Sequence, residues 1–386
     1  MRRNMVLALI ACGMASTTAL AFQSTIGNAD EAFLPRLIVS STIPANGDLN
    51  PYGVAFVPQN FPGGGAIAPG DVLISNFNSS KNVQGTGTTI VKLTPDGTVV
   101  PPVAPGKHGN AVTFFTSMRR GLSTALGVLQ GGFVLVGNVP TTDGTFNTIK
   151  QGALQVIDRN GNLVNTFASP VFLDTPWDLT INDSGTRAQV FVSNVKSGTV
   201  SRLDISVGPS NVSIVHMTEI AMGYPVQPNA AAVILGPTGL AYDKTTDILY
   251  VASTADNTIY AVPYAGTAAS LAVKGTPVFV SPRLIGPLAL VFAPNGHLLT
   301  ANGDATANND PTHPSEIIEF TKSGQFVREF NVDAAQGGAF GIASVVAGHP
   351  RFNFAAVDDV PNVISVYDFD TAGSAGGALE AGVTGQ

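Results

Sequence analysis

Short apolar runs separated by turn-forming residues recur along most of this 386-residue chain. The clearest example lies between Gly236 and Pro263, where apolar segments at 239–242, 248–252 and 258–262 are joined by stretches rich in Asp, Asn, Thr and Ser. The joining residue types favour turns, whereas the Val, Ile, Leu and Tyr of the runs favour strands. The pattern therefore predicts three consecutive β-strands connected by tight turns.

The same unit recurs six times. Each copy opens with a turn into a first strand, predicted at residues 50–56, 121–128, 175–181, 236–242, 286–292 and 340–344. The second strands are predicted at residues 72–76, 133–138, 190–194, 249–253, 298–302 and 354–358. The third strands are predicted at residues 89–93, 153–157, 199–203, 258–262, 316–320 and 363–367. Turns such as 95–97 and 159–162 then lead into a fourth strand.

Six four-stranded units, spaced by about 55 to 60 residues on average, predict an all-β fold: a six-bladed β-propeller of four-stranded antiparallel blades. Strands covered on both faces by neighbouring blades read as continuous apolar runs, as the segment 133–136 does. Gly239, Ala241, Gly341 and Ala343 are small, as expected where the innermost strands converge on the axis. Two β-sandwiches would need stricter alternation and would not explain the sixfold repeat.

The last unit has no fourth strand of its own, because Gly- and Ala-rich sequence follows its third strand. The apolar segment 37–41 precedes the first unit, and we expect it to complete the last blade and close the ring. We therefore predict a single propeller domain at residues 22–370 and a flexible Gly/Ala-rich tail at residues 371–386.

The first 21 residues have the pattern of an export signal. Arg2 and Arg3 precede an apolar stretch, and Ala19 and Ala21 are the small residues before a cleavage site. Cleavage after Ala21 would place the mature protein in the periplasm or outside the cell. The alternative is a bacterial lipobox-like segment that ends at Cys12 and would give a lipoprotein. The apolar stretch is too short to span a bilayer, so no transmembrane segment is expected.

Charged residues make up 12% of the chain, the net charge is −7, and basic residues form no continuous run. Nucleic acid and anionic membrane surfaces are therefore not expected as partners. Cys12 is the only cysteine, so a chain cleaved after Ala21 would contain neither disulfides nor cysteine-bound metals.

Two slots of the repeat, both on one predicted face, hold candidate ligand-binding residues. Asp178 occupies a slot that holds glycine in other copies, as at Gly53 and Gly239, and it follows Trp177, the only tryptophan. At the end of the second strand the copies carry short polar residues, namely Asn76, Asn138, Asn194, Ser253, Asn302 and Asp358. A ring of these side chains around the channel mouth would bind a cation or small polar ligand together with Asp178 and Trp177. Alternatively, each of them caps the turn that follows.

The longest insertions, at residues 76–88, 139–151 and 302–315, belong to the same predicted face. The last contains Asp304 and Asp310, which with Asp178 are candidate ligands for Ca²⁺, although no cofactor is required. The loop departs from an EF-hand, because it lacks the glycine at the sixth position and Glu316 falls one residue late. As a surface loop of turn-forming residues it also needs no metal.

The P-x-G-[LV]-A-[FY] opening, the L-[YF]-V-[AS]-[NS] second strand and the N-x-I-x-[VF] third strand resemble NHL repeats. Over residues 50–367 the chain also resembles secreted propellers of the virginiamycin-B-lyase, gluconolactonase and strictosidine-synthase-like kinds. The gluconolactonase resemblance implies a divalent metal held by a Glu near the first opening, but residues 50–53 contain no Glu. The lyase resemblance implies a His near the channel, and only His108 and His313 lie in loops expected to reach its mouth.

Two functions fit this sequence. The first is an exported binding module that recognises a peptide, glycan or protein partner, or a small polar ligand, through its long-loop face. The second is a metal-dependent hydrolase or lyase that acts on a lactone or cyclic ester at the channel mouth. We favour the binding module, because no acid–base pair is visible and a fold resemblance is a weak basis for assigning catalysis.

Overall fold

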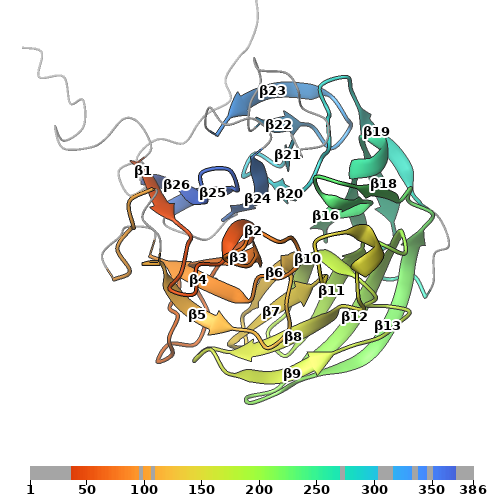
Figure 1. The fold of residues 1–386 in the computed structure, drawn as a ribbon. Helices are drawn as coiled ribbons and strands as arrows, with labels where there is room; N and C mark the ends of the chain where they lie inside the picture. The colour runs from red at the N-terminus through yellow and green to blue at the C-terminus, as the bar shows by residue number, and fades with distance from the viewer. Residues whose placement is uncertain are drawn as a thin grey trace, which may run out of the picture.

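The structure is a computed structural model that describes residues 36–94, 99–105, 109–269, 274–302, 316–332, 338–345 and 351–370. Six four-stranded antiparallel sheets surround a central axis, as Figure 1 shows. The predicted six-bladed propeller is therefore confirmed. The predicted export signal, the Cys12 alternative and the predicted tail all fall outside the described residues.

In blades 1 to 5 the strands follow the chain from the axis outward, and in blade 6 the outermost strand comes from the start of the chain. Blade 1 consists of β2 (Leu49–Phe56), β3 (Val72–Asn78), β4 (Thr89–Leu93) and β5 (Val112–Thr116). Blade 2 consists of β6 (Leu122–Leu129), β7 (Phe133–Asn138), β8 (Ala153–Asp158) and β9 (Leu163–Phe167). Blade 3 consists of β10 (Pro176–Asp183), β11 (Arg187–Asn194), β12 (Thr199–Val207) and β13 (Val212–Met222).

The remaining blades repeat this order. Blade 4 consists of β16 (Pro237–Asp243), β17 (Ile248–Ser253), β18 (Thr258–Pro263) and β19 (Thr276–Val280). Blade 5 consists of β20 (Leu290–Phe292), β21 (Leu298–Ala301), β22 (Glu316–Phe320) and β23 (Phe326–Asn331). Blade 6 consists of β24 (Ala339–Ser344), β25 (Arg351–Asp358), β26 (Val363–Asp370) and β1 (Arg36–Ser41).

Strand β1 closes the ring, as predicted. It pairs antiparallel with β26 over its whole length, from Arg36 opposite Asp368 to Ser41 opposite Val363. In Figure 1 the red N-terminal strand lies beside the blue C-terminal blade. At the end of β1 the amide of Ser41 also donates to the carbonyl of Val103 at 2.7 Å. Strand β1 thus pairs with the edge that β26 would otherwise expose.

The apolar core is divided among the contacts between blades. One cluster, for example, joins Leu135 and Val156 of blade 2 to Val190 and Leu203 of blade 3, and all four are fully buried. Near the axis the strands approach so closely that a Cβ on Gly239 would lie 2.1 Å from the carbonyl oxygen of Leu288. Only glycine fits at such a contact. No helix in the described part of the chain is long and apolar enough to span a membrane.

One face of the propeller carries the turns into the innermost strands and the loops between the second and third strands; we call it the long-loop face. A short hairpin that the sequence did not predict, β14 (Gln227–Asn229) and β15 (Val233–Leu235), lies on this face. The side chain of Gln84 donates to the carbonyl of Ala231, so the hairpin contacts the long loop of blade 1. The opposite face carries the turns between the first and second strands.

Candidate functional site

The innermost strands of the six blades enclose a cavity of about 470 Å³ on the propeller axis. Each blade contributes an apolar side chain to its wall, namely Val54, Leu126, Leu179, Leu240, Leu290 and Ile342. Two residues further along each strand a second set lines the cavity: Phe56, Val128, Ile181, Tyr242, Phe292 and Ser344. Most of the side chains that line the cavity are therefore apolar, although about half of its exposed surface is polar. The volume of the cavity is within the range of about 300–1,000 Å³ that is usual for small-molecule sites.

An aromatic cluster closes the cavity toward the long-loop face. Tyr52 stacks on Phe77 and on Phe340, with ring centroids 4.5 Å apart in both pairs, and Trp177 meets Tyr52 edge-on at 5.8 Å. All four rings are buried, with exposures of 3% or less. Val233 of the β14–β15 hairpin packs into the same apolar cluster. Trp177, the only tryptophan, thus belongs to this aromatic cluster, which we call the plug, and is not exposed to a ligand on this face.

The cavity opens on the opposite face. A second hollow of about 290 Å³ shares Val128, Ile181 and Tyr242 with it and extends to Asp183 and Lys244 in the turns between first and second strands. The sequence led us to expect a channel mouth on the long-loop face. The difference arises because aromatic residues precede the opening slot in three blades, at Tyr52, Trp177 and Phe340, and fill the axis there.

Asp178 is the only charged residue among the described residues that line the cavity. It follows Trp177 in β10, so it lies next to the closed end, and the residue is 8% exposed. Its Oδ1 accepts a hydrogen bond from the amide of Leu179 at 2.7 Å, and the amide of Leu240 also bonds the carboxyl. The hydrogen bonds from these amides lower the pKa of Asp178, but the loss of hydration on burial has the larger effect and raises this pKa to about 8.

The predicted polar ring is buried and bonded to the backbone. Asn76, Asn138, Asn194, Asn302 and Asp358 are all fully buried, as is Ser253, and none of them lines the cavity. The amide Nδ2 of Asn76 donates to the carbonyl of Thr42 at 3.1 Å. The corresponding acceptors for Asn138, Asn194 and Asn302 are the carbonyls of Arg120, Phe172 and Arg283.

Each of these carbonyls belongs to the segment that leads into the innermost strand of the same blade, so the amides hold those turns in place. A ligand-binding role for the ring stays a prediction, but the contacts favour the structural alternative. Asp178 is the one member of the predicted site that faces the cavity.

The described residues of this cavity do not form a metal site. Ca²⁺ needs about six to eight oxygen ligands, whereas the lining around Asp178 offers no second carboxylate. Among the described residues no group of three or more His, Cys, Asp or Glu side chains could hold a metal. Near the first opening, where the gluconolactonase resemblance implies a Glu ligand, the ring of Tyr52 stacks on Phe340 and meets Trp177 edge-on. Asp304, Asp310, His108 and His313 lie in segments that the structure does not describe.

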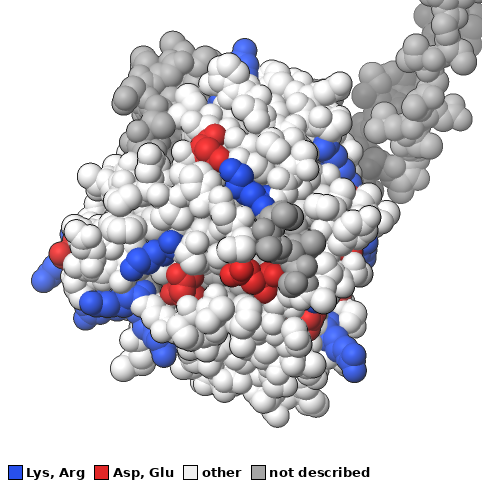
Figure 2. Space-filling view, turned by 90° about the vertical axis from the view of Figure 1, so that its right-hand side faces the viewer, with Lys and Arg blue, Asp and Glu red and all other residues white. Residues whose placement is uncertain are grey.

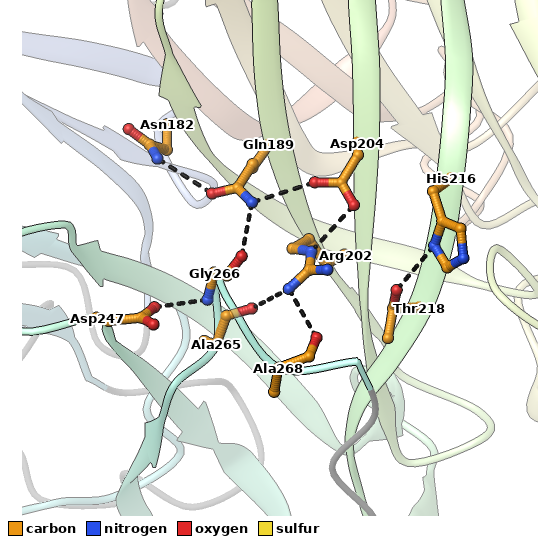
Figure 3. A network of polar contacts seen from close by, with 10 residues as sticks. All are labelled: Asn182, Gln189, Arg202, Asp204, His216, Thr218, Asp247, Ala265, Gly266 and Ala268. Atoms are coloured by element: carbon orange, nitrogen blue, oxygen red, sulfur yellow. Dashed lines mark hydrogen bonds and ion pairs between the residues drawn. The ribbon is translucent and has the colours of Figure 1, made fainter.

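A further hollow of about 590 Å³ lies at the edge of blade 3, and its polar groups hold blades 3 and 4 together (Figure 3). The buried guanidinium of Arg202 donates to the carbonyls of Ala265 and Ala268 at 2.9 and 3.1 Å, and Nε lies 3.3 Å from Oδ2 of Asp204. Gln189 bonds both Asp204 and the carbonyl of Gly266. Because these donors are engaged by the next blade, the network is a structural connection rather than an open binding site.

Comparisons with known proteins agree on the fold. No family model matches the chain, and no curated protein matches its sequence. Among solved structures, the chain resembles a gluconolactonase from Xanthomonas campestris, with 12% identity, a TM-score of 0.51, and coverage of 86% of this chain and 90% of that one. A putative oxidoreductase (glucose dehydrogenase) from Thermus thermophilus gives 11% identity, a TM-score of 0.51, and coverage of 86% and 100%.

The chain is a six-bladed β-propeller, structurally similar to these enzymes. A luciferin-regenerating enzyme also matches, with 12% identity, a TM-score of 0.48, and coverage of 86% of this chain and 95% of that one. At identities this low the similarity shows the fold alone, because one propeller framework supports many unrelated activities. The assignment to NHL repeats in particular stays a prediction.

Proposed function

We propose that this propeller is a binding protein whose axial cavity takes a small ligand with an apolar body and one basic nitrogen. The observation that carries the proposal is a single buried carboxyl, that of Asp178, next to the closed end of a cavity whose other described lining residues are uncharged and mostly apolar. A ligand entering from the opposite face would lay its apolar part along the strand wall and bring its nitrogen to Asp178. The predicted export signal supports placing this protein in the periplasm or outside the cell.

The charge of the ligand follows from the cost of burying Asp178. In a low-dielectric cavity an ionised carboxylate without a partner is unstable, which is why its pKa is raised. An ammonium group next to the carboxylate supplies the missing opposite charge and makes the pair neutral overall. A carboxylate ligand would add a second negative charge. A purely apolar ligand would displace water from the Asp178 carboxyl without supplying a hydrogen-bond partner in its place.

The alternative is a hydrolase or lyase acting on a lactone or cyclic ester, and one observation favours it. A carboxyl whose pKa is about 8 can take up or release a proton near neutral pH, as a general acid or base does. Its weakness is the lack of a second reacting group. Tyr242, which also lines the cavity, has its pKa raised to about 12 by burial and by its hydrogen bond to Asp247, so it stays protonated.

A matched ligand series tests the proposal. Hexylamine, hexanol and hexanoate share one apolar chain and differ only in the head group. Calorimetric titration of the full-length protein should show hexylamine binding at least about tenfold more tightly than hexanol, a difference of about 1.4 kcal/mol, and no binding of hexanoate. In Asp178→Asn, which keeps the side-chain size and loses the charge, the preference for the amine should disappear.

Two results would contradict the proposal: equal affinities for the amine and the alcohol in the wild type, or an amine preference that persists in Asp178→Asn. Hydrolysis of a lactone by the wild type that is lost in Asp178→Asn would instead support the enzyme alternative.

A further inference from the structure

Some cations on the described surface form ion pairs, as in Lys274–Asp256, Arg283–Glu329 and Lys322–Asp243. One group of exposed cations without an ion pair among the described residues, which includes Arg187 and Lys244, lies on the face opposite the long loops. A second group, Arg119, Arg120, Lys150 and Lys196, is exposed and forms no ion pair within the described part of the chain. We call these four residues the basic corner. On the side of the molecule that Figure 2 shows, Lys and Arg side chains lie among Asp and Glu side chains.

The backbone brings the basic corner together on the long-loop face. The turn that holds Arg119 and Arg120 lies against the start of the long loop of blade 2, because the amide of Val139 donates to the carbonyl of Gly121 at 2.7 Å. Lys150 is at the end of that loop, with its amide bonded to the carbonyl of Pro140 at 2.8 Å. The turns and loop thus present their cations from one region.

Lys150 and Lys196 line a common pocket of about 310 Å³ between blades 2 and 3, together with Gln151, Pro170, Asp174 and Thr175. The amide of Lys196 is held by Oγ1 of Thr175 at 2.9 Å, and its Nζ lies 5.8 Å from the ring centroid of Phe146.

The acidic residues near the basic corner do not neutralise it. Asp174 lines the same pocket, but its Oδ1 accepts a hydrogen bond from the hydroxyl of Ser197 at 3.0 Å, and burial raises its pKa. The carboxyl of Asp143 is bonded by Thr145 and Thr148 of its own loop. Neither acid forms an ion pair with Lys150 or Lys196 within the described residues. The cations are therefore available to an anionic partner.

We propose that the basic corner binds an extended acidic peptide, with side-chain carboxylates at Lys150, Lys196 and the two arginines. A protein of net charge −7 repels anions overall, and a region where four cations lie together attracts them. The pocket suits a peptide because Gln151, which is exposed, offers a polar side chain to a peptide backbone. A carbohydrate is less favoured, because the nearest aromatic ring, Phe146, is half-buried beneath Lys196. This site is independent of the axial cavity.

A fluorescein-labelled peptide of about ten glutamates tests the proposal by anisotropy with the full-length protein, from about 20 to 200 mM salt. We expect saturable binding that weakens as salt rises. The double variant Lys150→Gln/Lys196→Gln should lower the affinity about tenfold, as expected for two exposed charge contacts. The control, Arg187→Gln/Lys244→Gln, removes the same charge from exposed residues of the opposite face and should change the affinity less than about twofold.

Unfolding curves of both variants should match the wild type, which shows that folding is unaffected. Lack of saturable binding at low salt would overturn the proposal, as would an equal loss in the control, since that would mean a general charge effect. Polygalacturonate competing more strongly than the peptide would assign the site to an acidic glycan and contradict the peptide.

Discussion

Removing residues 36–41, with everything that precedes them, is expected to cost this protein about 5 kcal/mol or more, which is comparable with the total stability of many domains. The strand pairs with β26 along its whole length, buries Ile38, and bonds the segment after β4 through Ser41. Without it, both the ladder hydrogen bonds and the apolar contacts of the closing strand are lost. The edge of β26 would also be exposed to pairing with other chains.

Urea unfolding followed by circular dichroism measures this loss, and size-exclusion chromatography detects the expected aggregation. The matched control is deletion of residues 2–30, which keeps β1 and should leave the unfolding midpoint unchanged. An unchanged midpoint in the longer deletion would mean that β1 does not close the ring.

Replacing Trp177 with alanine is expected to lower the free energy of unfolding by about 4 kcal/mol, the size of loss typical of a buried aromatic ring. The ring is 2% exposed and contacts Tyr52 and Phe77 in the plug. Trp177→Phe, which retains an aromatic ring at this position, should lose considerably less. Chemical denaturation of the three proteins measures the difference.

A loss below about 1 kcal/mol for Trp177→Ala would mean that the indole is not packed as described. It would restore the interpretation, made from the sequence, of Trp177 as an exposed ligand contact.

The repeat predicted the framework well, because each strand carries its own local signal. The predicted segments 89–93 and 133–138 coincide with β4 and β7, and the segment 37–41 lies within β1. Closure could be predicted because the last unit visibly lacked a strand and an apolar segment was left over at the other end. These features depend on composition and spacing, which one sequence displays directly.

The site was only partly predictable. Asp178 was found because it breaks a repeated glycine slot. The plug was missed, although aromatic residues immediately precede that slot in three blades, because sequence does not show that Tyr52, Trp177 and Phe340 meet on the axis. The asparagine ring left two interpretations open for a related reason: the acceptors of Asn76 and Asn138 are backbone carbonyls, which leave no pattern in the sequence. The direction in which the cavity opens follows from these contacts.

The buried carboxyl of Asp178 also makes stability depend on pH. Its pKa is about 8 in the folded protein against an ordinary value of 3.8, so between these values the folded state holds a proton that the unfolded chain has released. The stability linked to this group is therefore fully present below about pH 4 and is lost as the pH rises toward 8. A bound ammonium favours the ionised carboxylate and should lower its pKa.

The titration of Asp178 itself tests the proposed binding site most directly. Carbon NMR of the full-length protein labelled at aspartate carboxyls, with the Asp178 signal assigned by its absence in Asp178→Asn, follows this group alone. The account predicts a midpoint near pH 8 in the free protein and a fall of about two units or more with saturating hexylamine. A midpoint near the ordinary value in the free protein, or one that hexylamine leaves unchanged, would contradict it.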